Sequence, residues 1–144
     1  MLFRSRIATP DSVFAIPAGR LGVAYPQDSI DRLVGTIGAT HSSHLLLTAE
    51  RITAERALAI GLINEIVDGA SIRMRTNELA HAIAANAPLT LKAAKFGIQT
   101  AIRGGQVDDR MRALQASVDC WESADFVEGR EAFAAKRSPV WAGH

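Results

Sequence analysis

The sequence predicts a mixed α/β chain in which a short β-containing segment is followed by a mainly helical body. Three observations carry this prediction. A short apolar run at residues 13–16 is closed by Pro17, as at the end of a strand. Apolar residues take up helical spacing from Asp28 onward, and the last third of the chain reads as consecutive amphipathic helices. We find no internal repeat and no linker long enough to separate independent domains.

The first half of the chain contains one strand, two helical segments and one further extended segment. The strand at residues 13–16 leads into a loop with Gly19 and Gly22. Helical spacing then runs to Gly38, a natural stop, and a further turn or two continues to Leu47. Thr53 is suited to cap a short helix over residues 54–60, which Gly61 ends. Residues 63–67 form a short extended segment.

The second half is predicted to be four helices. Residues 71–85 form an amphipathic helix, and Pro88 suits the first turn of the next one. Gly104 and Gly105 break that helix, and a last helix runs from about Ala124 to Ala135. The expected buried stripe of the helix that starts at Pro88 is Leu91, Ala94, Ile98 and Ile102, and the apolar repeat of the following helix is Val107, Met111, Leu114, Val118 and Trp121.

Composition excludes several classes of partner. A formal net charge of +1 gives no electrostatic footprint for nucleic acid or an anionic membrane, and no stretch is long and apolar enough to span a bilayer. Cys120 is the only cysteine, so no intrachain disulfide can form. We expect a cytoplasmic protein without a signal peptide, in which Cys120 is a small hydrophobe on a helix face, with a reactive thiol as the alternative.

Motifs with known chemistry are few. His41 and His44 could share a helix face but lack a Cys, Asp or Glu partner at helical spacing, so no metal site is predicted. The sequence contains no nucleophile elbow, no phosphate-binding P-loop and no dinucleotide fingerprint. Charge clusters such as residues 108–110 and 128–131 are interpreted as solvated helix faces with i, i+4 pairs. From these residues alone the function stays open.

Four stretches, taken in order, resemble the second half of proteins of the crotonase superfamily, the enoyl-CoA hydratases and isomerases. They include ITAERA followed by GLINEIV, and the terminal stretch SADFVEGREAFAAKRSP. The four are residues 6–9 with 14–22; residues 35–38, 45–48, 52–57 and 61–67; residues 84–88 with 92–95; and residues 123–139. Their common order and spacing cover essentially the whole chain.

This resemblance implies an α/β crotonase-like fold of the ββα spiral family. The chain would be its C-terminal part, with one or two short strands and then a mainly α-helical trimerisation region. Residues 1–67 would be the last part of the spiral core, and residues 68–144 the helical region that builds trimers or hexamers. The family acts on acyl-CoA thioesters through an enolate, with CoA as part of the substrate and no separate cofactor.

The resemblance also implies that two backbone N–H donors, which stabilise the enolate, belong to segments that precede Arg6 in the family. Losing even one such donor typically costs about 10²–10³ in rate. We therefore expect the chain to be inactive alone and a separate N-terminal half to be a possible partner.

Three positions of the active site are indicated by the same resemblance. Hydratases of the family carry a glutamate directly after the proline that matches Pro17, and here that position is Ala18. General acid–base groups contribute roughly 10²–10⁴ in rate, so water addition is disfavoured. Tyr25 and Asp28 lie in the loop that differs most from hydratases and are candidate catalytic residues. The alternative is that Asp28 or Ser29 caps the next helix while Tyr25 only packs.

Phe133 and Lys136 match the aromatic and lysine residues that reach the CoA of a neighbouring subunit in the family. An aromatic ring beside adenine and a lysine beside phosphate are physically reasonable contacts. The alternative is that Phe133 fills the helical core and Lys136 sits near a helix C-terminus, where the dipole favours it.

The resemblance leaves the reaction open. The first alternative is an enzyme of the same fold with another outcome, namely isomerisation, decarboxylation or thioester hydrolysis, in which Ala18 is expected. The second is a non-catalytic oligomerisation subunit. We also expect the chain to associate, because helices that pack on other segments of the family fold would otherwise expose apolar faces.

Overall fold

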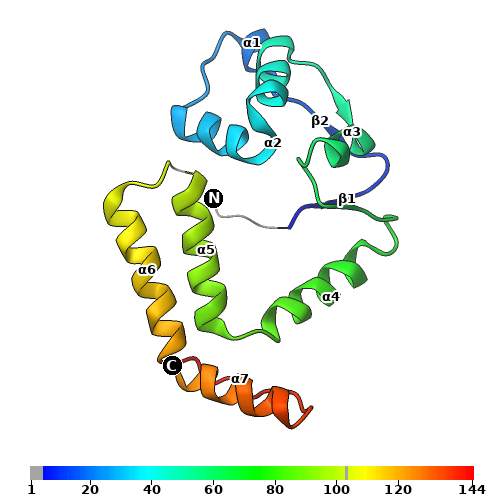
Figure 1. Ribbon diagram of the computed structural model, residues 1–144. Helices are drawn as coiled ribbons and strands as arrows, with labels where there is room; N and C mark the ends of the chain where they lie inside the picture. Colours follow the sequence, from blue (N-terminus) through cyan, green and yellow to red (C-terminus); the bar gives the residue numbers. More distant parts are fainter. Residues whose placement is uncertain (1–4, 103) are drawn as a thin grey trace. The chain divides into compact units, whose positions relative to one another are not determined.

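The computed structural model describes residues 5–102 and 104–144. They form two compact units, an N-terminal unit that ends at Glu78 and a C-terminal unit from Leu79 to His144. Helix α4 (Ile72–Ala84) runs through the boundary between them. Figure 1 colours the first unit from blue to green and the second from green to red.

Four strands of two residues each hold the N-terminal unit together. Strand β1 (Ile7–Ala8) pairs in parallel with β4 (Glu65–Ile66), and β2 (Val13–Phe14) pairs antiparallel with β3 (Ile52–Thr53). Asn64 extends the first pairing, because its N–H donates to the Arg6 carbonyl at 2.8 Å and its side-chain oxygen accepts the Arg6 N–H at 2.8 Å. Strands β2 and β4 lie in the two extended segments that the sequence predicts, and the structure adds β1 and β3.

Along the chain, three helices lie between β2 and β4. They are α1 (Ala18–Leu21), α2 (Gln27–Thr48) and α3 (Ala54–Ala59). Apolar residues of α2, α3, β1, β3 and the segment after α3 form a core, which consists of Ala8, Ile37, Leu45, Ile52, Ala54, Ala57, Ile60 and Ile63. The unit therefore has a hydrophobic core of its own.

Glycines and a threonine set the helix ends where the sequence predicts them. Gly38 has φ +75° and interrupts the helical conformation within α2, which therefore consists of two helices joined at a kink. Thr53 caps α3, because its hydroxyl accepts the Arg56 N–H at 3.3 Å. Gly61, at φ +76°, lets the chain turn from α3 toward β4. These predictions are confirmed.

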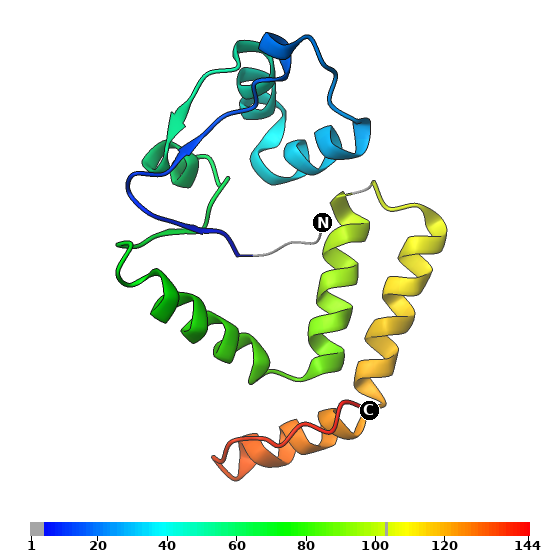
Figure 2. The same cartoon turned by 180° about the vertical axis from the view of Figure 1, so that it is seen from behind.

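The C-terminal unit is made of helices. After α4 come α5 (Pro88–Ile102), α6 (Val107–Trp121) and α7 (Ala124–Ala134). Figures 1 and 2 both show α5 and α6 side by side and running in opposite directions. Ser123 caps α7 by accepting the Phe126 N–H at 3.1 Å.

The predicted apolar stripes of α5 and α6 are largely exposed in this chain. On α5, Ala94 and Ile98 are exposed, so the prediction of a fully buried stripe is wrong. On α6 the whole repeat is exposed, with Val107, Met111, Leu114, Val118 and Trp121 at 74%, 61%, 59%, 36% and 67%. The periodicity correctly identifies the helices, but the described residues of the C-terminal unit leave much of the surface of these side chains uncovered.

The last residues run back along α7, as Figure 2 shows. Asp125, which is only 3% exposed, accepts the N–H groups of Ala142 at 2.6 Å and Gly143 at 3.1 Å. The indole N–H of Trp141 donates to the Ala85 carbonyl at 2.7 Å. The tail therefore ties α7 to the segment between α4 and α5.

Candidate functional site

Ala18 stands at the first position of α1, directly after Pro17, and is 6% exposed. Its carbonyl accepts the Val23 N–H at 3.2 Å, and Gly22, at φ +66°, closes the short helix. The main chain around position 18 is thus fixed by a complete helical turn. Its side chain is a buried methyl group, which can neither donate nor accept a proton.

Tyr25 lies in the loop between α1 and α2 and is 41% exposed. A half-exposed phenol is accessible to a ligand and can donate or accept a hydrogen bond. Its role as a catalytic candidate stays a prediction.

Asp28 lies in the first turn of α2, where its charge is favourable to the helix dipole. Its carboxylate forms an i, i+4 ion pair with Arg32. The N-cap of α2 is Pro26, without a side-chain cap, so the interpretation of Asp28 or Ser29 as the cap is wrong. Proline can end an extended segment just before a helix, and it leaves Asp28 free to pair one turn further on.

Phe133 and Lys136 lie at the far end of α7. Phe133 is 88% exposed, so the alternative in which it fills the helical core is wrong. Lys136 follows the helix and adopts the left-handed conformation, with φ +52°. Its N–H donates to the Phe133 carbonyl at 3.2 Å, so one hydrogen bond joins the two candidate residues. Both side chains are exposed at the same end of α7, and a ring together with an ammonium suits a ligand with both a flat base and a phosphate.

An apolar groove lies between α5, α6 and α7, with a volume of about 810 Å³. Trp121 and Phe126 meet edge to face in its lining, with ring centroids 4.9 Å apart, and the Arg130 guanidinium lies 5.7 Å from the Phe126 ring centroid. The side chains that characterise the groove are Ala94, Trp121, Phe126, Phe133 and Trp141. Phe133 thus belongs both to the groove and to the candidate CoA-contacting pair.

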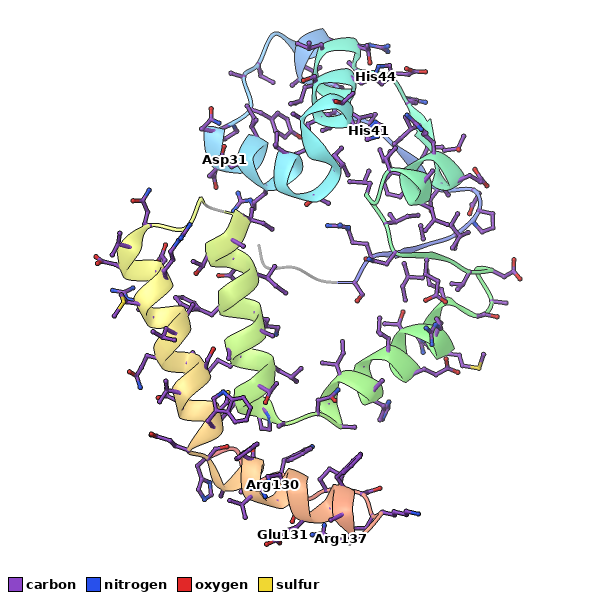
Figure 3. All side chains as sticks on the ribbon, viewed as in Figure 1. Asp31, His41, His44, Arg130, Glu131 and Arg137 are labelled. Atoms are coloured by element: carbon purple, nitrogen blue, oxygen red, sulfur yellow. The ribbon has the colours of Figure 1, made fainter. Side chains whose placement is uncertain are left out.

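Glu128 holds the turn after α7. Its two carboxylate oxygens accept the two Arg137 Nη groups at 2.6 and 2.8 Å, and Oε1 also accepts the Val140 N–H at 2.7 Å. Arg137 and then the Val140 N–H lower the pKa of Glu128 from 4.5 to about 2. The interpretation of residues 128–131 as a solvated face with i, i+4 pairs is therefore wrong for Glu128, whose partners lie beyond the helix. Figure 3 labels Arg130, Glu131 and Arg137 in this region.

A pH dependence follows from Glu128. Because its pKa is lower in the folded chain than the ordinary 4.5, its contribution to stability is complete above pH 4.5 and is lost as the pH falls toward about 2. We expect the thermal midpoint to fall more steeply with acidification in the parent than in Glu128→Gln. Melting curves at steps between those two pH values test this. Parallel curves for parent and variant would contradict it.

His41 and His44, the pair considered as metal ligands, both lie on α2. Figure 3 shows His41 and His44 on α2, and the His44 ring lies 2.8 Å from the Glu50 carboxylate. Within residues 5–102 and 104–144, no three His, Cys, Asp or Glu side chains are grouped as metal ligands would be. Over the same residues, no helix is both long enough and apolar enough to cross a membrane.

The structure places the candidate residues in two groups. Ala18, Tyr25 and Asp28 belong to the N-terminal unit, and Phe133 and Lys136 belong to the C-terminal unit. Sequence reasoning missed Asp125, Glu128 and Trp141 as the residues that shape the second group. The nine-residue separation of Glu128 and Arg137 has no helical periodicity, so only the pairing of opposite charges across the helix end could have suggested it.

Comparison with known proteins gives a consistent result. Residues 5–144 match the enoyl-CoA hydratase/isomerase family. Methylmalonyl-CoA decarboxylase from Escherichia coli K12 is 32% identical over 142 residues, which are 96% of this chain and 54% of that protein. Carnitinyl-CoA dehydratase from Salmonella typhi is 30% identical, over 95% of this chain and 54% of that protein. The chain thus spans about half the length of these curated relatives.

Solved structures agree with the sequence comparison. The crystal structure of enoyl-CoA hydratase from Mycobacterium tuberculosis H37Rv superposes with a TM-score of 0.87 at 32% identity, over 98% of this chain and 56% of that one. The predicted fold class, the C-terminal helical part of a crotonase-like protein, is confirmed. The chain therefore belongs to the enoyl-CoA hydratase/isomerase family of the crotonase superfamily.

Proposed function

We propose that this chain provides half of an enzyme that acts on a CoA thioester through an enolate, and that the enolate forms by loss of carbon dioxide and not by addition of water. The observation that carries the proposal is Ala18. It is a buried methyl group on a fixed helical turn, at the position where hydratases of the family carry a glutamate.

The chemistry of the two reactions explains why Ala18 favours decarboxylation. In hydration, a base takes a proton from water as it attacks the β-carbon, and an acid protonates the α-carbon. In decarboxylation, the bond between the α-carbon and its carboxylate breaks, the electron pair moves into the thioester carbonyl, and carbon dioxide leaves. No base is needed for that step, and only one proton is later taken up at the α-carbon. Removing a proton-transfer group therefore harms hydration more than decarboxylation.

The names of the relatives include both reactions, so the preference for decarboxylation rests on Ala18. One similar protein is a methylmalonyl-CoA decarboxylase, at 32% identity. Another is a carnitinyl-CoA dehydratase, at 30% identity, and removal of water is the second candidate reaction. Dehydration also needs a proton to be removed, so Ala18 argues against it. Isomerisation and thioester hydrolysis remain further alternatives within the family.

Tyr25 is the candidate that contacts the reacting part of the substrate. It is 41% exposed, close in sequence to Ala18, and its phenol can donate a hydrogen bond to a substrate carboxylate. Asp28 is the weaker candidate, because its carboxylate is paired with Arg32 and would repel an anionic substrate. The oxyanion donors belong to residues that the family resemblance places ahead of Arg6.

Phe133 and Lys136 are proposed to bind the nucleotide end of CoA, the ring against adenine and the ammonium beside phosphate. The support is the high exposure of Phe133 and the hydrogen bond that joins the two residues. A non-catalytic subunit would not need an exposed ring and cation together, so CoA binding distinguishes the enzyme from the purely structural alternative.

The exposed stripe on α6 is proposed to join copies of the protein into a trimer or hexamer. Five apolar side chains at helical spacing, each at least 36% exposed, form a continuous surface that water hydrates unfavourably.

We therefore expect the chain to sediment as an oligomer at micromolar concentration. Changing Met111 and Leu114 to glutamate should shift it toward the monomer, whereas Gln115→Lys should not, because that exposed residue already faces Asp119. Sedimentation velocity measures the difference. A monomeric parent would contradict the proposal.

The reaction itself is tested on a fusion polypeptide, in which this chain follows the first half of the Escherichia coli decarboxylase. We expect the fusion polypeptide to release carbon dioxide from methylmalonyl-CoA and to hydrate crotonyl-CoA weakly. Clean formation of 3-hydroxyacyl-CoA would contradict the proposal. Mass spectrometry of the thioester products distinguishes the two results.

A further inference from the structure

We propose that Glu128 and Arg137 are positioning residues, which act through Lys136 to hold the CoA-contacting pair in its binding geometry. This inference rests on the CoA subsite proposed above and adds to it the residues that create the subsite. Neither Glu128 nor Arg137 needs to touch the ligand.

The geometry of Lys136 requires a support. Its φ of +52° lies in the left-handed region, which a residue with a side chain adopts only when its surroundings impose it. The N–H of Lys136 donates to Phe133, and the N–H of Arg137 donates to the Ala132 carbonyl at 3.0 Å. These two hydrogen bonds wind the chain back over the end of α7 and set Lys136 beside Phe133.

The ion pair fixes the residues that follow this turn. The Glu128 carboxylate accepts hydrogen bonds from both Nη groups of Arg137 and from the N–H of Val140. Arg137 directly follows Lys136 and Val140 lies four residues after it, so one carboxylate holds two points of the chain beyond Lys136. Arg137 Nη1 also lies 3.3 Å from the Ser138 carbonyl. Two parallel hydrogen bonds define the orientation of the guanidinium, and they therefore restrict the position of Arg137. The backbone conformations open to Lys136, the preceding residue, are restricted as a result.

The rest of the tail makes this arrangement rigid. Asp125, one helical turn before Glu128, accepts the N–H groups of Ala142 and Gly143. A Cβ built on Gly129 would lie 3.4 Å from the Trp141 ring, which is an ordinary van der Waals distance, so the ring packs against α7 at this position. The tail beyond Val140 is thus held on α7 by Asp125. The pair of hydrogen bonds between Glu128 and Arg137, here called the fork, holds the turn that contains Lys136.

The substitutions Glu128→Gln and Arg137→Gln test the inference in the full 144-residue chain. They change the net charge in opposite directions, so a simple charge effect on an anionic ligand would move the two affinities in opposite directions. If Glu128 and Arg137 position Lys136, both substitutions must weaken binding. Freeing the backbone of one residue corresponds to roughly five- to thirtyfold in an equilibrium constant, and we expect a loss of about tenfold for each.

The probes are coenzyme A and 3′,5′-adenosine diphosphate, measured by calorimetry. The matched control is Glu65→Gln, which removes a carboxylate that likewise binds one arginine, Arg75, with both oxygens, at 2.7 and 3.0 Å in the N-terminal unit. Hydrogen exchange of the Val140 amide reports the turn directly, and it should become faster in both fork variants and stay unchanged in the control.

A double-mutant cycle separates positioning from general stability. If Glu128 acts through Lys136, Glu128→Gln should cost little further affinity in a Lys136→Gln background. Additive losses, affinities that move in opposite directions, or an affinity loss below about twofold would overturn the inference. Failure of the proposed CoA subsite would give a different result. Either the parent would not bind coenzyme A, or Phe133→Ala and Lys136→Gln would leave its affinity for coenzyme A unchanged. In both cases the exchange of the Val140 amide would still respond to Glu128→Gln.

Discussion

Replacing Asp125 with alanine is expected to lower the free energy of unfolding by about 3 kcal/mol and the thermal midpoint by roughly 10 °C. The carboxylate is 3% exposed and accepts the main-chain N–H groups of two tail residues, Ala142 and Gly143. Hydrogen bonds to a charged acceptor are among the stronger ones, and the substitution leaves both donors without that partner. The tail should then leave α7 and expose the Trp141 ring.

The control for this prediction is Asp119→Ala on α6. Asp119 is exposed and accepts one hydrogen bond from Gln115 at 2.8 Å, so its loss should cost no more than about 0.5 kcal/mol. Chemical denaturation of both variants, with tryptophan fluorescence as the signal, measures the two effects. Equal stabilities of the two variants would show that the tail contributes nothing to the fold.

Replacing Ala18 with glutamate in the fusion polypeptide is expected to raise the rate of crotonyl-CoA hydration by about 10²-fold or more. The new carboxyl group would stand at the first position of α1, where the main chain is already fixed by the Val23 hydrogen bond. A buried carboxyl group has a raised pKa, which suits it to donate as well as accept a proton near neutral pH.

Ala18→Gln is the matched control, because glutamine has nearly the same shape but does not transfer protons. We expect the glutamine variant to hydrate no faster than the parent, with steady-state kinetics as the measurement. Equal hydration rates for the glutamate and glutamine variants would mean that position 18 does not decide the reaction. Comparable melting curves for both variants ensure that the difference is catalytic.

The helices could be predicted from the sequence because their signals are local. Gly38, Thr53 and Gly61 each act on the backbone within a few residues, and the structure has a kink, a cap and a left-handed turn at these positions. Strand β3 was missed because two residues give no periodicity. Its place depends on pairing with β2, a partner far away in the sequence.

The exposure of the helix stripes could not be predicted in the same way. Ala94 and Ile98 follow the spacing of a buried face, but spacing does not reveal which surface will cover that face. The same physical reason applies to Phe133, whose apolar character is compatible with a core position and with a ligand contact. Only its exposed fraction of 88% excludes the core alternative.

The residues that position the candidate site could not be predicted from the sequence for a related reason. Glu128 follows the spacing of a solvated helix face, yet its partners are Arg137 and Val140, beyond the helix end. Asp125 is an ordinary first-turn acidic residue in the sequence, and its burial arises only when the tail folds back. By contrast, the significance of Ala18 could be predicted without the structure, because the sequence itself shows that this position has no ionisable group.

The reaction in heavy water is the most direct measurement of the central claim, that the enolate arises by loss of carbon dioxide. Incubated with methylmalonyl-CoA in D₂O, the fusion polypeptide should release carbon dioxide and yield a thioester with one deuterium at the α-carbon, while crotonyl-CoA stays largely unchanged. Rapid conversion of crotonyl-CoA to the 3-hydroxyacyl thioester, with methylmalonyl-CoA left intact, would contradict the proposal that the enolate arises by decarboxylation.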